Sequence, residues 1–210
     1  MKKLIEPLGE AGYSVVNIDY PSTDYPIEEL AGKYISPAIA DCPANDTVHF
    51  VTHSMGGILL RYWLANAMTA EEQQRLGRAV MLGPPNHGSE LVDKLGRVWG
   101  FYALNGPAGL ELSTSNDSVP NQLAMGESLP LEVGVIAGSA SFNPLYSWLV
   151  PGKDDGKVSI ESTKLDGMTD FIVMSHTHTW MMRAKPIIGQ VIHFLEHGQF
   201  VHTDAETPAM

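Results

Sequence analysis

The sequence predicts an α/β protein built on a mostly parallel sheet flanked by helices. Short β-rich runs alternate with amphipathic stretches along the chain, which is the pattern of parallel strands joined by helices. The strand-like runs are almost continuously apolar, as expected of strands covered on both faces. With 210 residues, of which 44% are hydrophobic and 18% charged, the chain suits one domain with its own core. We expect a single domain over residues 1–200 and a polar tail over residues 201–210.

The predicted elements begin with a helix whose apolar stripe runs from Leu4 to Ala11 and stops at Gly12. The β-rich run Tyr13–Asp19 predicts the first strand, and a second amphipathic helix follows Pro26. Further strands are expected at residues 47–52, 78–82, 131–137 and 170–174. Further helices are expected at residues 55–68, after Ser89, and from Pro186 to a stop just before Gly198.

Residues 99–130 are poor in charge and rich in Gly, Asn, Ser and Pro, which predicts a long irregular excursion. Its apolar side chains either cap an acyl pocket or pack on one another at the surface. They are Phe101, Tyr102, Leu104, Leu110 and Leu112.

The charge balance excludes several classes of partner. Thirteen Lys and Arg residues against twenty-four Asp and Glu give a formal charge of −11, which repels nucleic acid and anionic lipid. No apolar stretch approaches the ~18 residues of a membrane span, so we expect no stable membrane insertion. The single cysteine, Cys42, has no partner at metal-ligand spacing, and neither a metal nor a cofactor is expected. Glu6 and Pro7 interrupt what would be the apolar region of a signal peptide, which predicts a cytoplasmic protein.

A candidate nucleophile lies between a predicted strand and a predicted helix. Thr52-His53-Ser54-Met55-Gly56-Gly57 fits the pattern small-x-Ser-x-Gly, in which a sharp turn holds the serine exposed. The Met55 N–H, at a helix N-terminus, is then placed to donate to a developing oxyanion. The alternative, purely structural interpretations are that Ser54 is an ordinary helix N-cap and that His53 is a packing residue in the wall of the site.

A serine hydroxyl needs a base, and the base needs an acid to orient it. Asp154 and Asp155 follow the strand predicted at residues 131–137, and His176 and His178 follow the strand predicted at 170–174. The order serine, acid, histidine is the one that accompanies a strand-turn-helix nucleophile. Asp166 precedes a strand instead of following one, and we do not expect it to be the acid.

These motifs resemble the α/β-hydrolase superfamily, in particular small bacterial lipases and esterases, over essentially the whole chain. The matching segments are His53-Ser54-Met55-Gly56-Gly57, Asp155-Gly156-Lys157-Val158-Ser159 and His178-Thr179-Trp180-Met181-Met182. The resemblance favours Asp155 over Asp154 and His178 over His176. It also implies that the segment Pro84–Ser89 is active-site wall, with Ser89 capping a helix.

The resemblance also implies an N-terminally shortened domain, because a central strand and an oxyanion loop precede the first helix in this family. That strand would lie between Val15–Asp19 and Val48–Thr52, so we expect these two to close on each other or another segment, including one from a second subunit, to lie between them. The lost loop would remove one oxyanion donor, for which Ser22 is a candidate replacement. Thr52 stands where the family usually has Gly.

The predicted function is a serine carboxylester hydrolase acting on short to medium acyl esters. In it Ser54 attacks, His178 transfers the proton, Asp155 orients His178, and Met55 N–H stabilises the oxyanion. The alternatives are a thioesterase or amidase, and a hydrolase-fold protein that binds a ligand or partner with little turnover.

Overall fold

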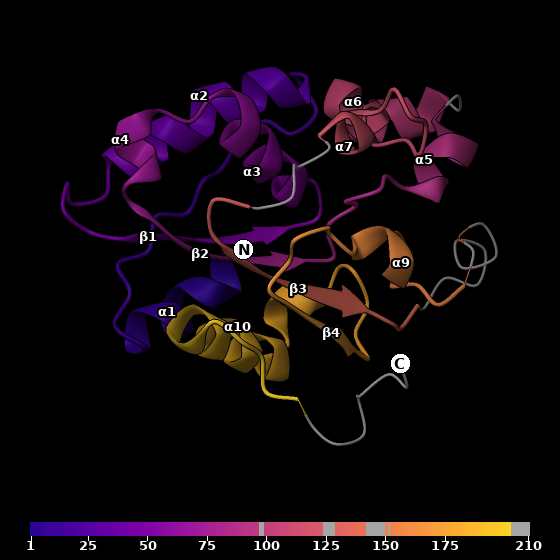
Figure 1. Ribbon diagram of the computed structural model, residues 1–210. Coiled ribbons are helices and arrows are strands. Elements are labelled where there is room, and N and C mark those ends of the chain that lie inside the picture. Colours follow the sequence, from indigo (N-terminus) through magenta and orange to yellow (C-terminus); the bar gives the residue numbers. More distant parts are fainter. Residues whose placement is uncertain (97–98, 124–128, 142–149, 151, 203–210) are drawn as a thin grey trace.

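The computed structural model describes residues 1–96, 99–123, 129–141, 150 and 152–202 of the chain. Its centre is a four-stranded sheet in the order β1-β2-β3-β4, with every neighbouring pair parallel (Figure 1). The strands are β1 (Val48–His53), β2 (Leu76–Leu82), β3 (Glu132–Gly138) and β4 (Asp170–Met174). The predicted fold class and these four strands are confirmed. Because all four run the same way, their carboxyl ends share one edge of the sheet, where chemistry is expected.

Helices cover both faces of this sheet (Figure 1). One face carries α1 (Ile5–Glu10), which a 3-10 turn at Lys2–Leu4 precedes, and α10 (Lys185–His197). The opposite side carries α2 (Ile27–Ala40), α3 (Met55–Asn66), α4 (Ala70–Gln73), α5 (Glu90–Leu95), α6 (Trp99–Leu110) and α7 (Val119–Gln122). Two short helical segments, α9 (Ile160–Thr163) and a 3-10 turn at Met181–Arg183, flank β4 in sequence. Within the described residues, no helix is both long and apolar enough to cross a membrane.

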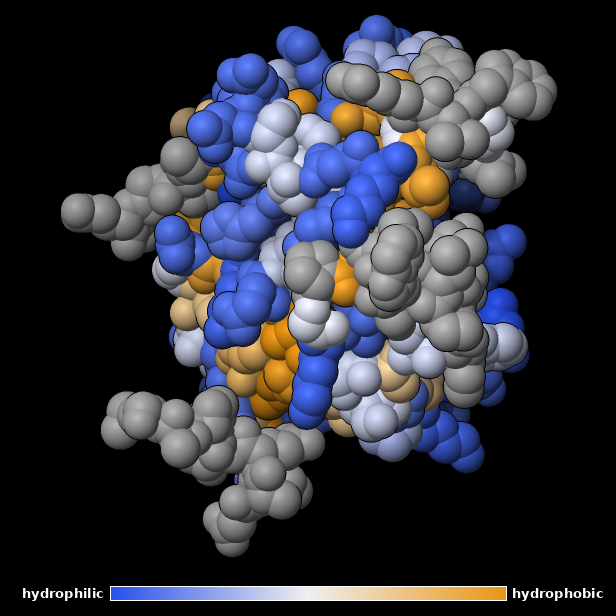
Figure 2. Space-filling view, turned by 90° about the vertical axis from the view of Figure 1, so that its right-hand side faces the viewer, coloured by the Kyte–Doolittle hydropathy of each residue, from blue (hydrophilic) through white to orange (hydrophobic). Residues whose placement is uncertain are grey.

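The strands divide their side chains between two cores because successive residues point to opposite faces. Ala79 and Met81 of β2 pack with the apolar side chains of α2 and α3, whereas Val80 and Leu82 pack with those of α1 and α10. All four are fully buried. This two-sided burial explains why the strand sequences are apolar without alternation. On the molecular face in Figure 2, hydrophilic side chains predominate, with smaller hydrophobic areas between them.

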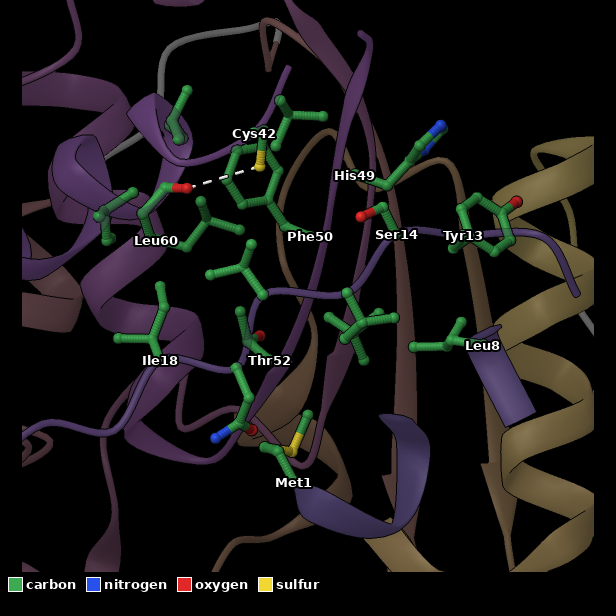
Figure 3. Close-up of a pocket in the computed structure, with 18 of the residues that line it drawn as sticks. Met1, Leu8, Tyr13, Ser14, Ile18, Cys42, His49, Phe50, Thr52 and Leu60 are labelled. Atoms are coloured by element: carbon green, nitrogen blue, oxygen red, sulfur yellow. Dashed lines mark hydrogen bonds between the residues drawn. The ribbon is translucent and has the colours of Figure 1, made fainter. Parts of the chain in front are cut away.

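The strand expected at Tyr13–Asp19 is a wrong prediction. These residues run extended but belong to no strand, and residues 14–19 make no hydrogen bond through backbone or side chain. The physical reason is the lack of a partner, since a strand exists only through its ladder with a neighbour. The sheet ends at β1, whose outer edge pairs with no strand in the described part of the chain. Within the described chain the two segments do not close on each other and no strand lies between them, and a cavity separates the run from β1 (Figure 3).

The excursion over residues 99–130 is more regular than predicted, because it contains α6 and α7. The chain kinks inside α6 at Gly106, where φ is +63° and the backbone passes the Thr23 carbonyl too closely for a side chain. Leu112 is buried, and Leu110 is half-buried. The side chains of Phe101, Tyr102 and Leu104, which we expected over an acyl pocket, lie outside the described residues.

Candidate active site

Ser54 occupies a strained turn between β1 and α3. Its φ of 54° and ψ of −128° make it the one non-glycine residue with positive φ in the described ranges. The Ser54 N–H donates to the Leu82 carbonyl at 2.9 Å, which ties the turn to the end of β2. Such a conformation costs of order 1–3 kcal/mol and persists where the surrounding structure enforces it, typically at functional sites. Ser54 precedes α3 but makes no capping bond through its side chain.

The glycines after Ser54 allow α3 to approach the sheet. A Cβ on Gly57 would stand 2.9 Å from Cβ of Pro84, which is closer than side chains tolerate. A Cβ on Gly56 would meet Cβ of Thr52 at 3.6 Å, an ordinary contact. The sequence pattern placed the tight approach two residues after the serine, at Gly56. The structure places it at Gly57, because the loop after β2 lies against the first turn of α3.

His178 and Asp155 form a buried pair at the same edge of the sheet. Nδ1 of His178 lies 2.7 Å from Oδ2 of Asp155, and both side chains are almost completely buried. A carboxylate only accepts, so Nδ1–H of His178 donates to Asp155, and in the neutral imidazole this leaves the lone pair on Nε2. The other carboxylate oxygen, Oδ1, accepts from the backbone N–H groups of Lys157 at 3.0 Å and Val158 at 2.9 Å.

The backbone reinforces this pairing. The His178 N–H donates to the Asp155 carbonyl at 2.9 Å, so the acid and the histidine are joined through main chain as well as side chain. Gly83 and Gly138 make room for the pair, since a Cβ on Gly138 would stand 2.7 Å from Cβ of Asp155. The orientation of the His178 ring is therefore fixed from several sides.

The alternative acid and base are placed differently. Oδ1 of Asp154 accepts from the Gly156 N–H at 2.7 Å, which is an interaction within its own turn. Nδ1 of His176 is buried and has no hydrogen-bond partner among the described residues. Asp166 is exposed in the turn before β4. The structure thus brings Asp155 and His178 together, and no hydrogen bond joins Asp154 to His176.

His53 contacts the same histidine, a role that the sequence analysis did not predict. Nε2 of His53 lies 2.9 Å from the carbonyl oxygen of His178, and the two ring centroids are 4.7 Å apart. Because a carbonyl only accepts, His53 donates through Nε2–H. Burial is the main cause that lowers the pKa of His53 to about 3, with the nearby His178 ring adding to it, so this imidazole stays neutral. The residue next to Ser54 is thereby held directly against His178.

Met55 is the residue best placed to donate to an oxyanion beside Ser54. Met55 begins α3, so its N–H has no acceptor within the helix and is free to meet a ligand. Ser22 is exposed in the turn at residues 22–24. No hydrogen bond of the described chain joins its hydroxyl to the sharp turn at Ser54 between β1 and α3, which we call the elbow. Tyr20, two residues earlier, places its hydroxyl 3.7 Å from the position that a Cβ on Gly56 would take. In the described ranges, no cluster of three or more His, Cys, Asp or Glu residues could hold a metal ion.

The loop after β2 is tied to the segment that carries Asp155. Nδ2 of Asn86 donates to the Thr163 carbonyl at 2.8 Å, and the Ser89 hydroxyl donates to the Lys157 carbonyl at 3.0 Å. Ser159 donates to Oε1 of Glu90 at 3.1 Å. Ser89 therefore precedes α5 as expected but does not cap it through its side chain. Its hydroxyl donates instead to Lys157, in the loop that carries Asp155. His87 is exposed beside these contacts.

Arg61 is a second residue that the sequence analysis missed. Its side chain is buried and donates to the carbonyl oxygens of Asn86 at 2.8 Å, Pro120 at 3.1 Å and Leu123 at 2.6 Å. Burial lowers the pKa of Arg61 to about 10, so the guanidinium keeps its charge at neutral pH. Through Arg61, α3 holds both the loop after β2 and the end of the excursion.

Comparison with known proteins gives similarity in structure alone. The chain matches no protein-family model and no curated protein sequence. It is similar to solved structures of three hydrolytic enzymes, each matched with probability 1.00. The mature lipase BlEst2 of Bacillus licheniformis superposes with a TM-score of 0.64 at 16% identity, over 84% of this chain and 76% of that one.

The other two similar structures are larger relative to this chain. Phospholipase PlaB of Legionella pneumophila superposes with a TM-score of 0.70 at 19% identity, over 92% of this chain and 55% of the phospholipase. The metagenomic carboxyl esterase MGS0156 superposes with a TM-score of 0.62 at 17% identity, over 83% of this chain and 63% of the esterase. The chain thus spans little more than half the length of the phospholipase. These likenesses establish that it has the fold of lipases and esterases of the α/β-hydrolase type.

Proposed function

We propose that the protein is a serine carboxylester hydrolase. The observation that carries this proposal is that the strained Ser54 turn and the buried His178–Asp155 pair both follow strands at the same edge of the sheet. Ser54 Oγ attacks the acyl carbon while Nε2 of His178 takes its proton, and Asp155 holds the ring in the required tautomer. The Met55 N–H stabilises the tetrahedral oxyanion. The proton then passes from His178 to the leaving alcohol, and water releases the acyl group by the same route.

The proposed substrates are short to medium acyl esters of neutral or cationic alcohols. The formal charge of −11 opposes adsorption to anionic lipid surfaces. Higher turnover of a soluble butyrate ester than of an emulsified long-chain triglyceride would agree with this substrate class, and strong activation by the emulsion would contradict it.

A fluorophosphonate titration tests the nucleophile. The wild type should label at one equivalent per chain, because covalent capture requires an activated serine. Ser54→Ala should not label, whereas Ser175→Ala, which removes an exposed serine beside the His178 segment, should label like the wild type. Labelling of Ser54→Ala at the wild-type rate would reject Ser54 as the nucleophile.

A second candidate function is binding with little turnover. It is favoured by the exposed position of Ser22, which leaves Met55 N–H as the one donor identified at the elbow in the described residues. The loss of one oxyanion donor lowers kcat by ~10²–10³. Full labelling by the fluorophosphonate combined with very slow hydrolysis of butyrate, thioester and amide substrates would support this function over the first.

A further inference from the structure

The elbow and His178 follow the two outermost strands of the sheet. In the order β1-β2-β3-β4 the elbow follows β1 and His178 follows β4, and these strands are roughly 14 Å apart. Residues 175–178 must therefore cross the ends of β3 and β2. A Cβ on Gly138, at the end of β3, would stand 2.5 Å from the His176 carbonyl oxygen. A Cβ on Gly83, just after β2, would stand 3.2 Å from Nδ1 of His178, so glycines keep this path open.

His53 holds the far end of this crossing. Its Nε2–H donates to the His178 carbonyl at 2.9 Å, and the two ring centroids lie 4.7 Å apart. Among the hydrogen bonds of the described residues, this is the one that joins β1 and the elbow directly to residues 175–178. Because His53 immediately precedes Ser54, the bond ties the candidate base to the residue beside the candidate nucleophile.

Three of the four polar groups of His178 are occupied by bonds within the protein. Its backbone N–H and its Nδ1–H donate to Asp155, and its carbonyl accepts from His53. The fourth group, Nε2, is the one that takes the proton from Ser54 in the proposed mechanism. Asp155 belongs to the chain between β3 and β4, so its bonds position His178 relative to that part of the chain. The bond from His53 is the one that positions His178 relative to β1.

The charge state of His53 suits a group that holds a base. Burial is the main cause that lowers its pKa to about 3, and the His178 ring and Lys157 add to this effect. The bond to the His178 carbonyl and the Asp155 carboxylate act in the opposite direction without cancelling it. His53 is therefore neutral near pH 7, with its one ring proton on Nε2. A neutral donor places no positive charge beside His178, where such a charge would oppose protonation of the base.

We propose that His53 is a positioning residue, which sets the distance between Ser54 and Nε2 of His178 by holding the His178 backbone against the elbow. The inference rests on the proposed ester hydrolase function. Proton transfer requires Oγ of Ser54 and Nε2 of His178 to come within hydrogen-bond reach, and a displacement of about 1 Å can cost 10²-fold in rate. His53 therefore supports kcat, whereas substrate binding does not depend on it.

Three substitutions of His53 separate its donor from its volume. His53→Gln carries an amide donor near the position of Nε2, His53→Asn carries one that is too short to reach the carbonyl, and His53→Leu carries none. We expect His53→Leu and His53→Asn to lower kcat for a butyrate ester by about tenfold or more, with KM changed by less than about threefold. His53→Gln should stay within about threefold of the wild-type kcat. If His53→Leu does not fold, the Asn and Gln variants make the same comparison with two polar side chains.

Two further measurements distinguish positioning from a general loss of stability. Phe200→Leu is the matched control, because Phe200 is buried against Phe194 of α10, and it should keep the wild-type kcat while it lowers stability. Hydrogen exchange at the backbone N–H groups of His176 and His178 should become faster in His53→Leu and His53→Asn, and stay as in the wild type in His53→Gln. This exchange does not depend on turnover.

Several results would overturn the proposal. These are a wild-type kcat in His53→Leu, an equal loss of kcat in His53→Gln and His53→Leu, and a loss in Phe200→Leu as large as that in His53→Leu. Unchanged exchange at His178 in a His53→Leu variant of low kcat also overturns it, because the segment has then not moved. A wild type that neither hydrolyses the ester nor labels at Ser54 refutes the proposed hydrolase function, and exchange at His178 then decides whether His53 holds the segment.

Discussion

Gly83 lies so close to Asp155 that a Cβ atom added to it would stand 3.0 Å from Oδ2, the oxygen that holds His178. The same atom would stand 3.2 Å from Nδ1 of His178. Gly83 follows β2 directly and has a φ of +52°. Gly83 forms no hydrogen bond with the acid–base pair. Its lack of a side chain is nevertheless a condition for the pair, because a Cβ atom would crowd both partners.

Gly83→Ala should lower kcat of ester hydrolysis by about tenfold or more, because displacing a reacting group by a fraction of an ångström is costly. The control is Gly167→Ala, at which φ is also positive, +78°, but the nearest atom is 3.8 Å away. Both variants should lose ~1–2 kcal/mol of stability from the left-handed backbone. Steady-state kinetics measures the loss of kcat, and urea unfolding measures the loss of stability. Equal kcat values for the two variants would contradict the role of Gly83.

Ser54→Ala and His178→Ala should each reduce hydrolysis of a butyrate ester by at least ~10³-fold, since removing either member removes the activated nucleophile. His176→Ala should keep at least about a tenth of the activity. Initial rates on correctly folded protein, checked by circular dichroism, provide the measurement. A His176→Ala variant as inactive as Ser54→Ala would mean that the base is misassigned.

His53 should make stability depend on pH. Its pKa is about 3 in the folded protein against 6.5 as the ordinary value, so the unfolded chain takes up a proton in this window and the folded chain does not. The free energy of unfolding should therefore fall by up to ~1.4 kcal/mol for each pH unit from about pH 6 towards pH 3.

Urea unfolding at several pH values checks this dependence. His53→Gln removes the titrating group and should flatten the slope below pH 6, whereas His87→Gln, at an exposed position, should leave it unchanged. The prediction fails if the wild type and His53→Gln lose stability in parallel as the pH falls.

The two glycines after the elbow should respond differently to alanine. Gly57→Ala forces a methyl group to 2.9 Å from Pro84 and should destabilise the protein by ~1–3 kcal/mol through overpacking. Gly56→Ala meets its neighbours at ordinary contact distance and should be neutral or stabilising by up to ~1 kcal/mol, because alanine favours the helix. Chemical denaturation of the two variants gives the comparison, and the reverse ranking would contradict the observed approach of α3 to the loop.

Arg61→Met should lower the free energy of unfolding by about 2–4 kcal/mol, because it leaves buried carbonyl oxygens without a donor. Arg61→Lys should recover only part of this loss, since an ammonium group cannot span three carbonyls in the way a planar guanidinium does. Arg183→Met, at an exposed arginine, serves as the control and should change stability by less than ~0.5 kcal/mol. A similar loss in the two methionine variants would argue against a special role for Arg61.

The strands that the sequence predicted correctly are those whose stability comes from burial on both faces. Residues 79–82 illustrate this, because an unbroken apolar run is best accommodated in the middle of a sheet that is covered on both faces. The run Tyr13–Asp19 has the same β-rich composition but lacks a neighbouring strand, and composition does not reveal whether a neighbour exists. The positions of Ser54, Asp155 and His178 after strands followed from chain order, whereas their catalytic roles stay predictions.

The residues that escaped prediction act over long sequence separations. His53 donates to a carbonyl 125 residues away, and Arg61 donates to carbonyls 25 to 62 residues away. A backbone carbonyl carries no sequence signature, so neither partner is visible in a motif. The helices α6 and α7 were also missed, because Gly106, Pro107 and Pro120 read as helix breakers although the chain uses them at a kink and at a helix start.

The hydrogen bonds between the loop after β2 and the acid segment have a consequence for how the protein can change. Asn86, Ser89 and Glu90 bind the Lys157–Thr163 segment, and Asp155 binds His178 through two separate contacts. The acid and the histidine are therefore held by loops that are bonded to one another, and the Ser89 N–H, which donates to the Leu112 carbonyl at 2.8 Å, extends this network to the segment after α6. A substitution that shifts one of these loops is expected to be felt at Asp155 and His178, although it lies far from them in sequence. Natural variation and design are therefore expected to be tolerated best outside this network.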